Sequence, residues 1–125
     1  MKTLLFIVAA ISSSISRYDL HGAYEVTLDN EMQSCGAAAR LLADRYDIAI
    51  DWVKHTATVN LTPWALAFSD DAIVLTFQAE PDARTHLEMY LDTSGDIPRA
   101  RLFLSGFTES REACMDAVAL VGRNL

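Results

Sequence analysis

The sequence predicts a mainly β fold, an antiparallel up-and-down meander that closes into a small eight-stranded barrel. Apolar and polar residues alternate in seven short segments, which is the pattern of half-buried strands. The connections between them are short and rich in turn residues, and a parallel crossover would need a dozen or more residues. An eighth strand near the C-terminus would remove the exposed edges that otherwise invite aggregation.

The strand segments begin at residue 21 with HGAYEVTLDN, in which Tyr24 and Val26 point to the same side of an extended chain. The later segments are 47–52, 56–61, 64–69, 73–78, 86–92 and 99–105. The expected interior residues are Trp52, Trp64, Leu66, Phe68, Phe77, Leu87, Met89, Leu102 and Leu104. Because an eight-stranded barrel is just wide enough to be filled by its own side chains, this set favours a filled interior.

Two segments depart from the alternation. Residues 31–46 follow a candidate helix cap at Asn30 and have an Ala/Leu-rich body, so they predict a helical or loop insertion. Residues 108–125 contain good helix formers, yet 113–122 could also extend as the closing strand. The alternative fold is an open antiparallel α+β sheet with two helices, at 31–46 and 108–122. We favour the barrel because a seven-stranded meander leaves two edges to be covered.

The N-terminus has the features of a secretory signal peptide in the expected order. One lysine precedes the apolar run 4–11, and small residues follow, with Ser14 and Ser16 at the positions that a signal peptidase prefers. We therefore expect a signal peptide at 1–16 and a single secreted or periplasmic domain at 17–125. The run is too short to span a bilayer, which takes about 20 residues. The alternative is a buried N-terminal strand in a cytosolic protein.

The charge of the chain argues against several partners. The net charge is −7, and it becomes −8 when Lys2 leaves with the leader. The ten Lys and Arg residues are scattered, so neither nucleic acid nor an anionic membrane surface is an expected partner. The three histidines are far apart and no catalytic motif occurs, so we expect no metal, no cofactor and no catalytic residues. Asp92, Ser94 and Asp96 have calcium-loop spacing, but the pattern favours a hairpin turn.

Cys35 and Cys114 are the two cysteines of the chain, and an exported protein with an even number most simply pairs them. The predicted disulfide would contribute on the order of 4 kcal/mol to stability. The alternative is a pair of buried free thiols.

HGAYEV resembles the first strand of calycins, the lipocalin-like barrels, which carries Gly-x-Trp. The resemblance implies that Gly22 and Tyr24 hold these positions and that Arg123, in VGRNL, packs across the ring and closes the barrel. Within that group the chain is most similar to small periplasmic metalloprotease inhibitors, through its leader, its length and the stretch PWALAFSDDAIVLT. That similarity implies a mature N-terminal arm that enters a protease cleft. The arm consists of Arg17, Tyr18, Asp19, Leu20 and His21. The alternative is a disordered terminus.

These features predict a non-enzymatic secreted or periplasmic binding module. A filled barrel leaves its rim, loops and N-terminal arm as the working surface, so we expect an extracytoplasmic protein as the partner, in the manner of a hydrolase inhibitor. One alternative is a carrier of a small hydrophobic ligand inside the barrel. A second is a small exported enzyme of unknown chemistry.

Overall fold

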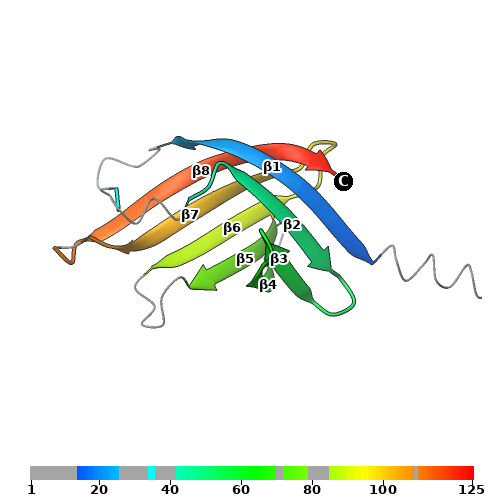
Figure 1. Cartoon of the computed structure of the whole chain (residues 1–125), viewed down its shortest axis with the longest axis horizontal. Coiled ribbons are helices and arrows are strands. Elements are labelled where there is room, and N and C mark those ends of the chain that lie inside the picture. Colours follow the sequence, from blue (N-terminus) through cyan, green and yellow to red (C-terminus); the bar gives the residue numbers. More distant parts are fainter. Residues whose placement is uncertain (1–13, 26–33, 36–41, 70–71, 79–84, 109) are drawn as a thin grey trace, which may run out of the picture.

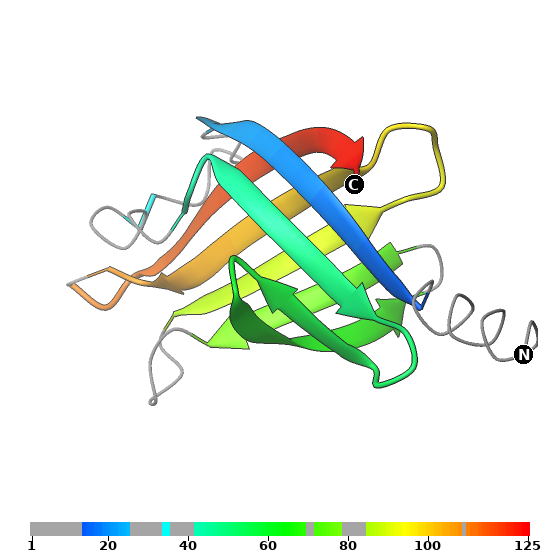
Figure 2. The same cartoon turned by 45° about the vertical axis from the view of Figure 1, so that its right-hand side comes forward.

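The computed structural model of the chain is a closed barrel of eight antiparallel strands (Figure 1). It describes residues 14–25, 34–35, 42–69, 72–78, 85–108 and 110–125. The strands are β1 (Ile15–Glu25), β2 (Arg45–Asp51), β3 (Thr56–Val59), β4 (Thr62–Ser69), β5 (Ala72–Gln78), β6 (His86–Asp92), β7 (Arg99–Phe107) and β8 (Ala113–Asn124). Each strand pairs with the next one, and β8 pairs with β1. Figure 2 shows the C-terminus beside β1. The predicted meander and its closure are confirmed.

The interior of the barrel is filled by the side chains that alternate inward. Every second residue along β6 is buried, as the period-two pattern predicts. The fully buried aliphatic side chains, from six strands, are Leu20, Ile48, Ile50, Leu75, Met89, Leu91, Leu102, Leu104 and Val118. Of the expected interior residues, those that are buried are Trp64, Leu87, Met89, Leu102 and Leu104. Each fully buried Leu or Ile contributes on the order of 2 kcal/mol.

Two of the apolar residues that we expected on the inner face, and a third from the alternating segment 56–61, lie at the rim instead. Phe68, at the end of β4, is 59% exposed. Trp52 follows the last residue of β2 and is partly buried, with its ring stacked on Phe68 at a centroid distance of 6.1 Å. Leu61 lies in the β3–β4 turn and is 94% exposed. The alternation fails here because a side chain at the end of a strand has no opposite wall to pack against.

The β3–β4 turn consists of Asn60 and Leu61, which both have a positive φ, 49° and 70°. Two-residue hairpins of this kind favour Gly at the second position, so Leu61 costs roughly 1 to 2 kcal/mol there. The Asn60 side chain accepts a hydrogen bond from the Asp47 N–H at 2.8 Å and donates one to the Arg45 carbonyl at 3.2 Å. It therefore extends the β2–β3 pairing beyond the end of β3.

Residues 31–46 contain no helix where the structure describes them. Residues 34–35 and 42–44 are irregular, and β2 already begins at Arg45. Tyr46 is buried, and its hydroxyl accepts a hydrogen bond from the Ala43 N–H at 2.6 Å. Burial raises the pKa of Tyr46, so the hydroxyl stays neutral. The described part of the expected insertion is a loop; residues 31–33 and 36–41 lie outside the described residues.

The C-terminal segment forms the closing strand. β8 pairs with β7 on one side and with β1 on the other, so the open sheet with a helix at 108–122 is not formed. β1 begins earlier than the segment 21–30, and residues 26–30 lie outside the described residues. Among the residues that the structure describes, no helix is long and apolar enough to cross a membrane.

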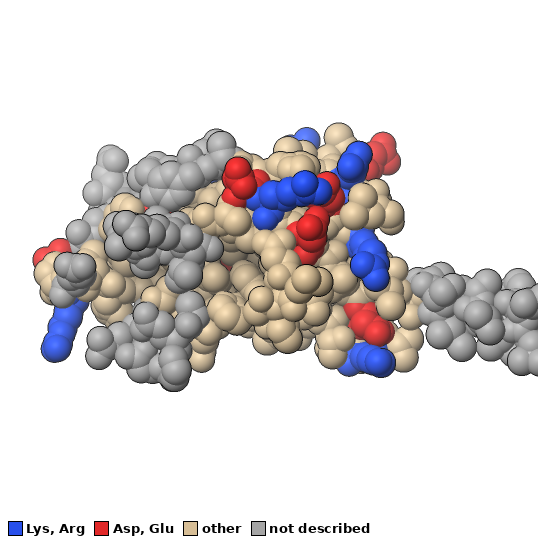
Figure 3. All heavy atoms as spheres, in the orientation of Figure 1, with Lys and Arg blue, Asp and Glu red and all other residues tan. Residues whose placement is uncertain are grey.

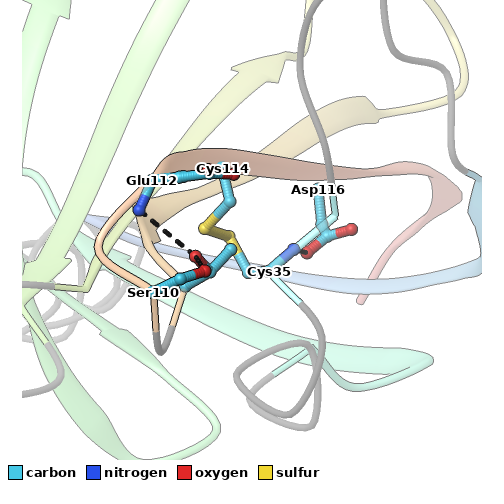
Figure 4. The surroundings of a disulfide bond; sticks show 6 residues. Cys35, Ser110, Glu112, Cys114 and Asp116 are labelled. Atoms are coloured by element: carbon cyan, nitrogen blue, oxygen red, sulfur yellow. Dashed lines mark hydrogen bonds between the residues drawn. A yellow bond between two sulfur atoms is a disulfide. The ribbon is translucent and has the colours of Figure 1, made fainter.

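Cys35 and Cys114 form the predicted disulfide, which links the segment before β2 to β8 (Figure 4). Both cysteines are buried. Asp116, two residues further along β8, is fully buried, and its Oδ2 accepts a hydrogen bond from the Cys35 N–H at 2.9 Å. Figure 4 shows the Asp116 carboxylate directed at Cys35. The loop before β2 is thus attached to β8 twice, through the disulfide of the Cys35 side chain and through the hydrogen bond of the Cys35 main chain.

Candidate functional site

The predicted binding arm is the central part of β1. Residues 17–21 pair with β2, and residues 18–21 also pair with β8. Tyr18 and Leu20 point inward and are buried, and Asp19 is buried on the outer side. A strand that is paired on both sides does not project from the molecule, so these residues are not a free arm. Their role in binding a partner stays a prediction.

The three predicted closure residues all lie where β1 meets β8. Gly22 is opposite Leu120, Tyr24 is opposite Val118, and Arg123 is opposite Asp19. Tyr24 and Arg123 are therefore five residues apart along the pair, which corresponds to about 17 Å at the rise of a strand. The expected packing of Arg123 across the ring of Tyr24 stays a prediction, because the Tyr24 side chain lies outside the described part of the structure.

Asp19 is the centre of an ion-pair cluster on the outer side of this closure. Its side chain is 2% exposed. Arg45 donates from Nε to Oδ1 at 3.1 Å and from Nη2 to Oδ2 at 3.3 Å. Arg123 Nη2 lies 3.8 Å from Oδ2, and His21 Nε2 lies 3.6 Å from the same oxygen. Figure 3 shows basic and acidic side chains next to one another over this face. The cluster ties β2, β1 and β8 together.

Replacing Asp19 should destabilise the barrel more than replacing one of its partners. We expect Asp19→Ala to lower the free energy of unfolding by about 2 kcal/mol, because Arg45 and Arg123 lose a buried counter-ion but are exposed enough to regain hydration. Arg123→Gln, the matched control, should cost less than about 1 kcal/mol, since this side chain is 74% exposed. Urea denaturation measures both. Equal losses for the two variants would contradict this account.

A groove runs along the outer wall of the barrel over β6, β7 and β8. This outer-wall groove consists of two adjoining hollows of about 510 and 460 Å³, and it opens at one end onto a third hollow of about 300 Å³ between the ends of β4, β5 and β6. It extends from Phe103 and Met115, past Tyr90 and Arg101, to Asp92 at the β6–β7 turn. The first two hollows share Tyr90 and Arg101, and the last two share Asp92.

The register explains why the wall is hollow here. Arg101 lies between Tyr90 of β6 and Ala119 of β8, and Phe103 lies between Glu88 of β6 and a buried alanine of β8. Large side chains on β6 and β7 thus stand beside small ones on β8. A step in height between neighbouring strands produces a groove parallel to them.

The aromatic residues of the groove hold one another in place. The rings of Tyr90 and Phe103 meet edge to face at a centroid distance of 5.8 Å, and the Arg101 guanidinium lies 5.2 Å from the centre of the Phe103 ring. The Tyr90 hydroxyl donates a hydrogen bond to Glu88 Oε2 at 3.3 Å. These contacts limit side-chain motion before any partner binds, which lowers the entropy cost of binding.

The ionisable groups of the groove have well-defined protonation states. The negative charge of Glu88, together with partial burial and the hydrogen bond to Glu88, raises the pKa of Tyr90, so its hydroxyl stays a donor at neutral pH. Hydrogen bonds from the hydroxyl and main chain of Ser94 lower the pKa of Asp92, so its carboxylate stays ionised. The groove therefore offers an acid at one end and Arg101 near its middle. Asp92 and Ser94 form a hairpin turn, as expected for this stretch.

Sequence reasoning missed this groove. In the alternating pattern Tyr90 and Phe103 fall on the outer side of their strands, and Tyr90 is indeed 38% exposed. The sequence feature that could have indicated the groove is an outward-facing aromatic residue on each of two consecutive strands, Tyr90 on β6 and Phe103 on β7. Strands that put a large aromatic side chain in water are candidates for a binding surface.

The histidines do not gather into one site. His21 lies beside Asp19, His55 is in the β2–β3 turn, and His86 Nε2 is 3.6 Å from Glu88 Oε1. Within the described ranges, no group of His, Cys, Asp and Glu side chains has the arrangement of a metal site.

The architecture limits what the calycin resemblance supports. A closed eight-stranded antiparallel barrel is consistent with a calycin-like fold. Gly22 and Arg123 both lie in the pair of strands that closes the barrel, and Arg123 forms an ion pair with Asp19 there. No protein-family model, no curated protein and no solved structure matches this chain.

Proposed function

We propose that this protein is a non-enzymatic, secreted or periplasmic binding module that holds an extended segment of a partner protein in the outer-wall groove. The observation that carries the proposal is the row of Tyr90, Phe103, Arg101 and Met115 along one side of the barrel. Tyr, Phe, Arg and Met are the residues enriched at protein interfaces, and Tyr and Arg are frequent hot spots.

The shape of the site favours a polypeptide over a small hydrophobic ligand. The groove follows the strands from the β6–β7 turn towards Met115, so it suits a chain in extended conformation. The barrel interior is occupied by fully buried side chains such as Met89 and Leu102. Binding on the outside leaves this packed core undisturbed.

The disulfide between Cys35 and Cys114 is consistent with an extracytoplasmic location, because such bonds persist in oxidising compartments. Inhibition of an extracytoplasmic hydrolase is the specific form of partner binding that we propose to test. Residues 17–21 are part of β1, so in that case the groove itself would contact the enzyme.

The test is site-specific photo-crosslinking in the exporting cell. A photoreactive residue at position 103 should form an adduct with a partner protein, whereas the same residue at Thr58 should not, because Thr58 lies on β3 on the opposite wall. With the partner purified, Tyr90→Ala and Arg101→Glu should each weaken binding at least tenfold. Thr58→Ala should leave the affinity unchanged.

Two results would contradict the proposal. Adducts that form equally from both walls would show that the groove is not the binding site. Micromolar displacement of a fluorescent fatty acid, together with unaltered binding of the Tyr90 and Arg101 variants, would favour the carrier alternative. A panel of secreted metalloproteases assayed with and without the protein tests the inhibitor form separately.

A further inference from the structure

Arg101 brings a positive charge to the middle of the outer-wall groove. Its side chain is exposed, and the guanidinium lies 5.2 Å from the centre of the Phe103 ring. Its direct neighbours are Tyr90 on β6 and Ala119 on β8, which carry no charge at neutral pH. Among the side chains that the structure describes, none forms an ion pair or a hydrogen bond with Arg101. The charge of Arg101 therefore has no counter-ion in this part of the chain.

The other charged groups of the groove do have partners. Asp92 is directly opposite Arg99 across the β6–β7 pair. Glu88 accepts a hydrogen bond from the Tyr90 hydroxyl at 3.3 Å, and the His86 Nε2 atom lies 3.6 Å from its other carboxylate oxygen. A further carboxylate placed beside either of these acids would be repelled. The groove thus favours negative charge near its middle and disfavours it at both ends.

A segment that enters the groove removes water from the Arg101 guanidinium. A buried donor that loses water and gains no acceptor costs binding free energy. A carboxylate is the acceptor that best matches the planar set of guanidinium donors, and it also neutralises the charge. A bound segment with an Asp or Glu side chain at Arg101 meets both requirements.

The two hollows on either side of Arg101 determine what flanks this carboxylate. Arg101 lines both of them; Phe103 and Met115 also line the first, and Ala119 and Leu120 also line the second. The outward residues of β7 repeat every two positions, about 7 Å, and an extended segment that lies along β7 has the same repeat. When its acid contacts Arg101, the side chains two positions before and after the acid lie over the two hollows.

We propose that the outer-wall groove recognises an extended segment in which an Asp or Glu, bound to the Arg101 guanidinium, has an apolar residue two positions before it and another two positions after it. This specificity rests on the proposed function, because it requires that the groove binds a polypeptide. Arg101 is then the residue that selects the segment, whereas Tyr90 and Phe103 supply apolar contact area. A segment with Lys or Arg at the central position is rejected by charge repulsion.

A displayed library of random peptides, selected on the purified full chain, tests this specificity. The wild-type protein should enrich the acidic pattern at least tenfold over the unselected library. Arg111→Gln is the matched control, since it removes an exposed arginine from the β7–β8 turn, and it should enrich the same pattern. Arg101→Gln should lose the preference for an acid, and Arg101→Glu should select Lys or Arg in its place. These variants replace exposed side chains, so the barrel should stay folded.

Three results would overturn the proposal. They are enriched peptides without a central acid, the same acidic enrichment on Arg101→Gln, and no enrichment on the wild-type protein. In each case the photo-crosslink from position 103 shows whether the proposed function fails as well. A partner adduct from that position would leave groove binding intact and contradict only the specificity for an acid. The absence of both the enrichment and the adduct would contradict the proposed function too.

Discussion

Removing the disulfide, by Cys35→Ala with Cys114→Ala, should lower the free energy of unfolding by about 4.5 kcal/mol. The bond joins residues 79 apart in sequence, and in the chain-entropy model a closed loop of this length restricts the unfolded chain by that amount. The total free energy of unfolding of a small domain is only about 5 to 15 kcal/mol, so much of the stability would be lost. Denaturant unfolding followed by tryptophan fluorescence measures the change.

The reduced wild-type protein is the matched control, since it loses the bond but keeps both cysteines. It should unfold at nearly the same denaturant concentration as the double variant. Asp116 would still accept the hydrogen bond from Cys35, so the native loop position should persist at low denaturant. If oxidised and reduced protein unfold at the same midpoint, the loop-closure account is wrong.

Gly22→Ala and Gly122→Ala should each destabilise the barrel by about 3 kcal/mol. A Cβ at Gly22 would lie 2.0 Å from the Ala119 carbonyl oxygen, and a Cβ at Gly122 would lie 1.9 Å from the Asp19 carbonyl oxygen. Both obstacles are main-chain atoms of the opposite strand. β1 and β8 would therefore have to separate where they close the barrel.

The geometry explains why glycine is required at both places. The Gly22 N–H bonds to the Asp44 carbonyl just beyond the β1–β2 pairing, and the Gly122 N–H bonds to the Pro98 carbonyl just beyond the β7–β8 pairing. Each strand thus leaves one neighbour while it approaches the other closely. Glycine permits such an approach because it has no side chain.

Gly95→Ala is the control, because a Cβ there has its nearest neighbour at 4.0 Å and should change stability by less than about 0.5 kcal/mol. A second control separates main-chain from side-chain crowding. Leu120 Cδ2 also lies 2.7 Å from the Cβ position of Gly22. Adding Leu120→Ala to Gly22→Ala should give no rescue if the carbonyl is the obstacle. Full rescue would attribute the cost to Leu120 instead.

The alternating pattern predicted most of the fold because burial depends on which side of the strand a residue faces. Met89 and Leu102 were expected inside and are fully buried there. Residues 113–122 were harder to assign, because a helix and a strand could both bury ACMDAVALV. The pairing of β8 with β1 and β7 gives this segment two neighbours, and this tertiary context selects the strand.

The candidate site was not predictable to the same extent. Tyr90 and Arg101 are 11 positions apart in sequence, and only the β6–β7 register makes them direct neighbours. The position of residues 17–21 inside β1 was not predictable for a related reason. No local feature of that segment reveals that β2 and β8 will pair with its two sides.

The sequence by itself determined the alternating strands from residue 47 to residue 105, their antiparallel meander and about half of the inward residues that we expected, and it favoured the disulfide and the closed barrel. Only the tertiary structure decided the register, and with it the outer-wall groove, the Asp19 cluster and the position where β1 begins. The physical reason is the two-residue period of a strand. Sliding one strand past another by two residues keeps every side chain on its face, so the burial pattern does not distinguish these registers. The register is distinguished by specific contacts, such as those of Arg123 with Asp19 and of Gly22 with the main chain of Ala119.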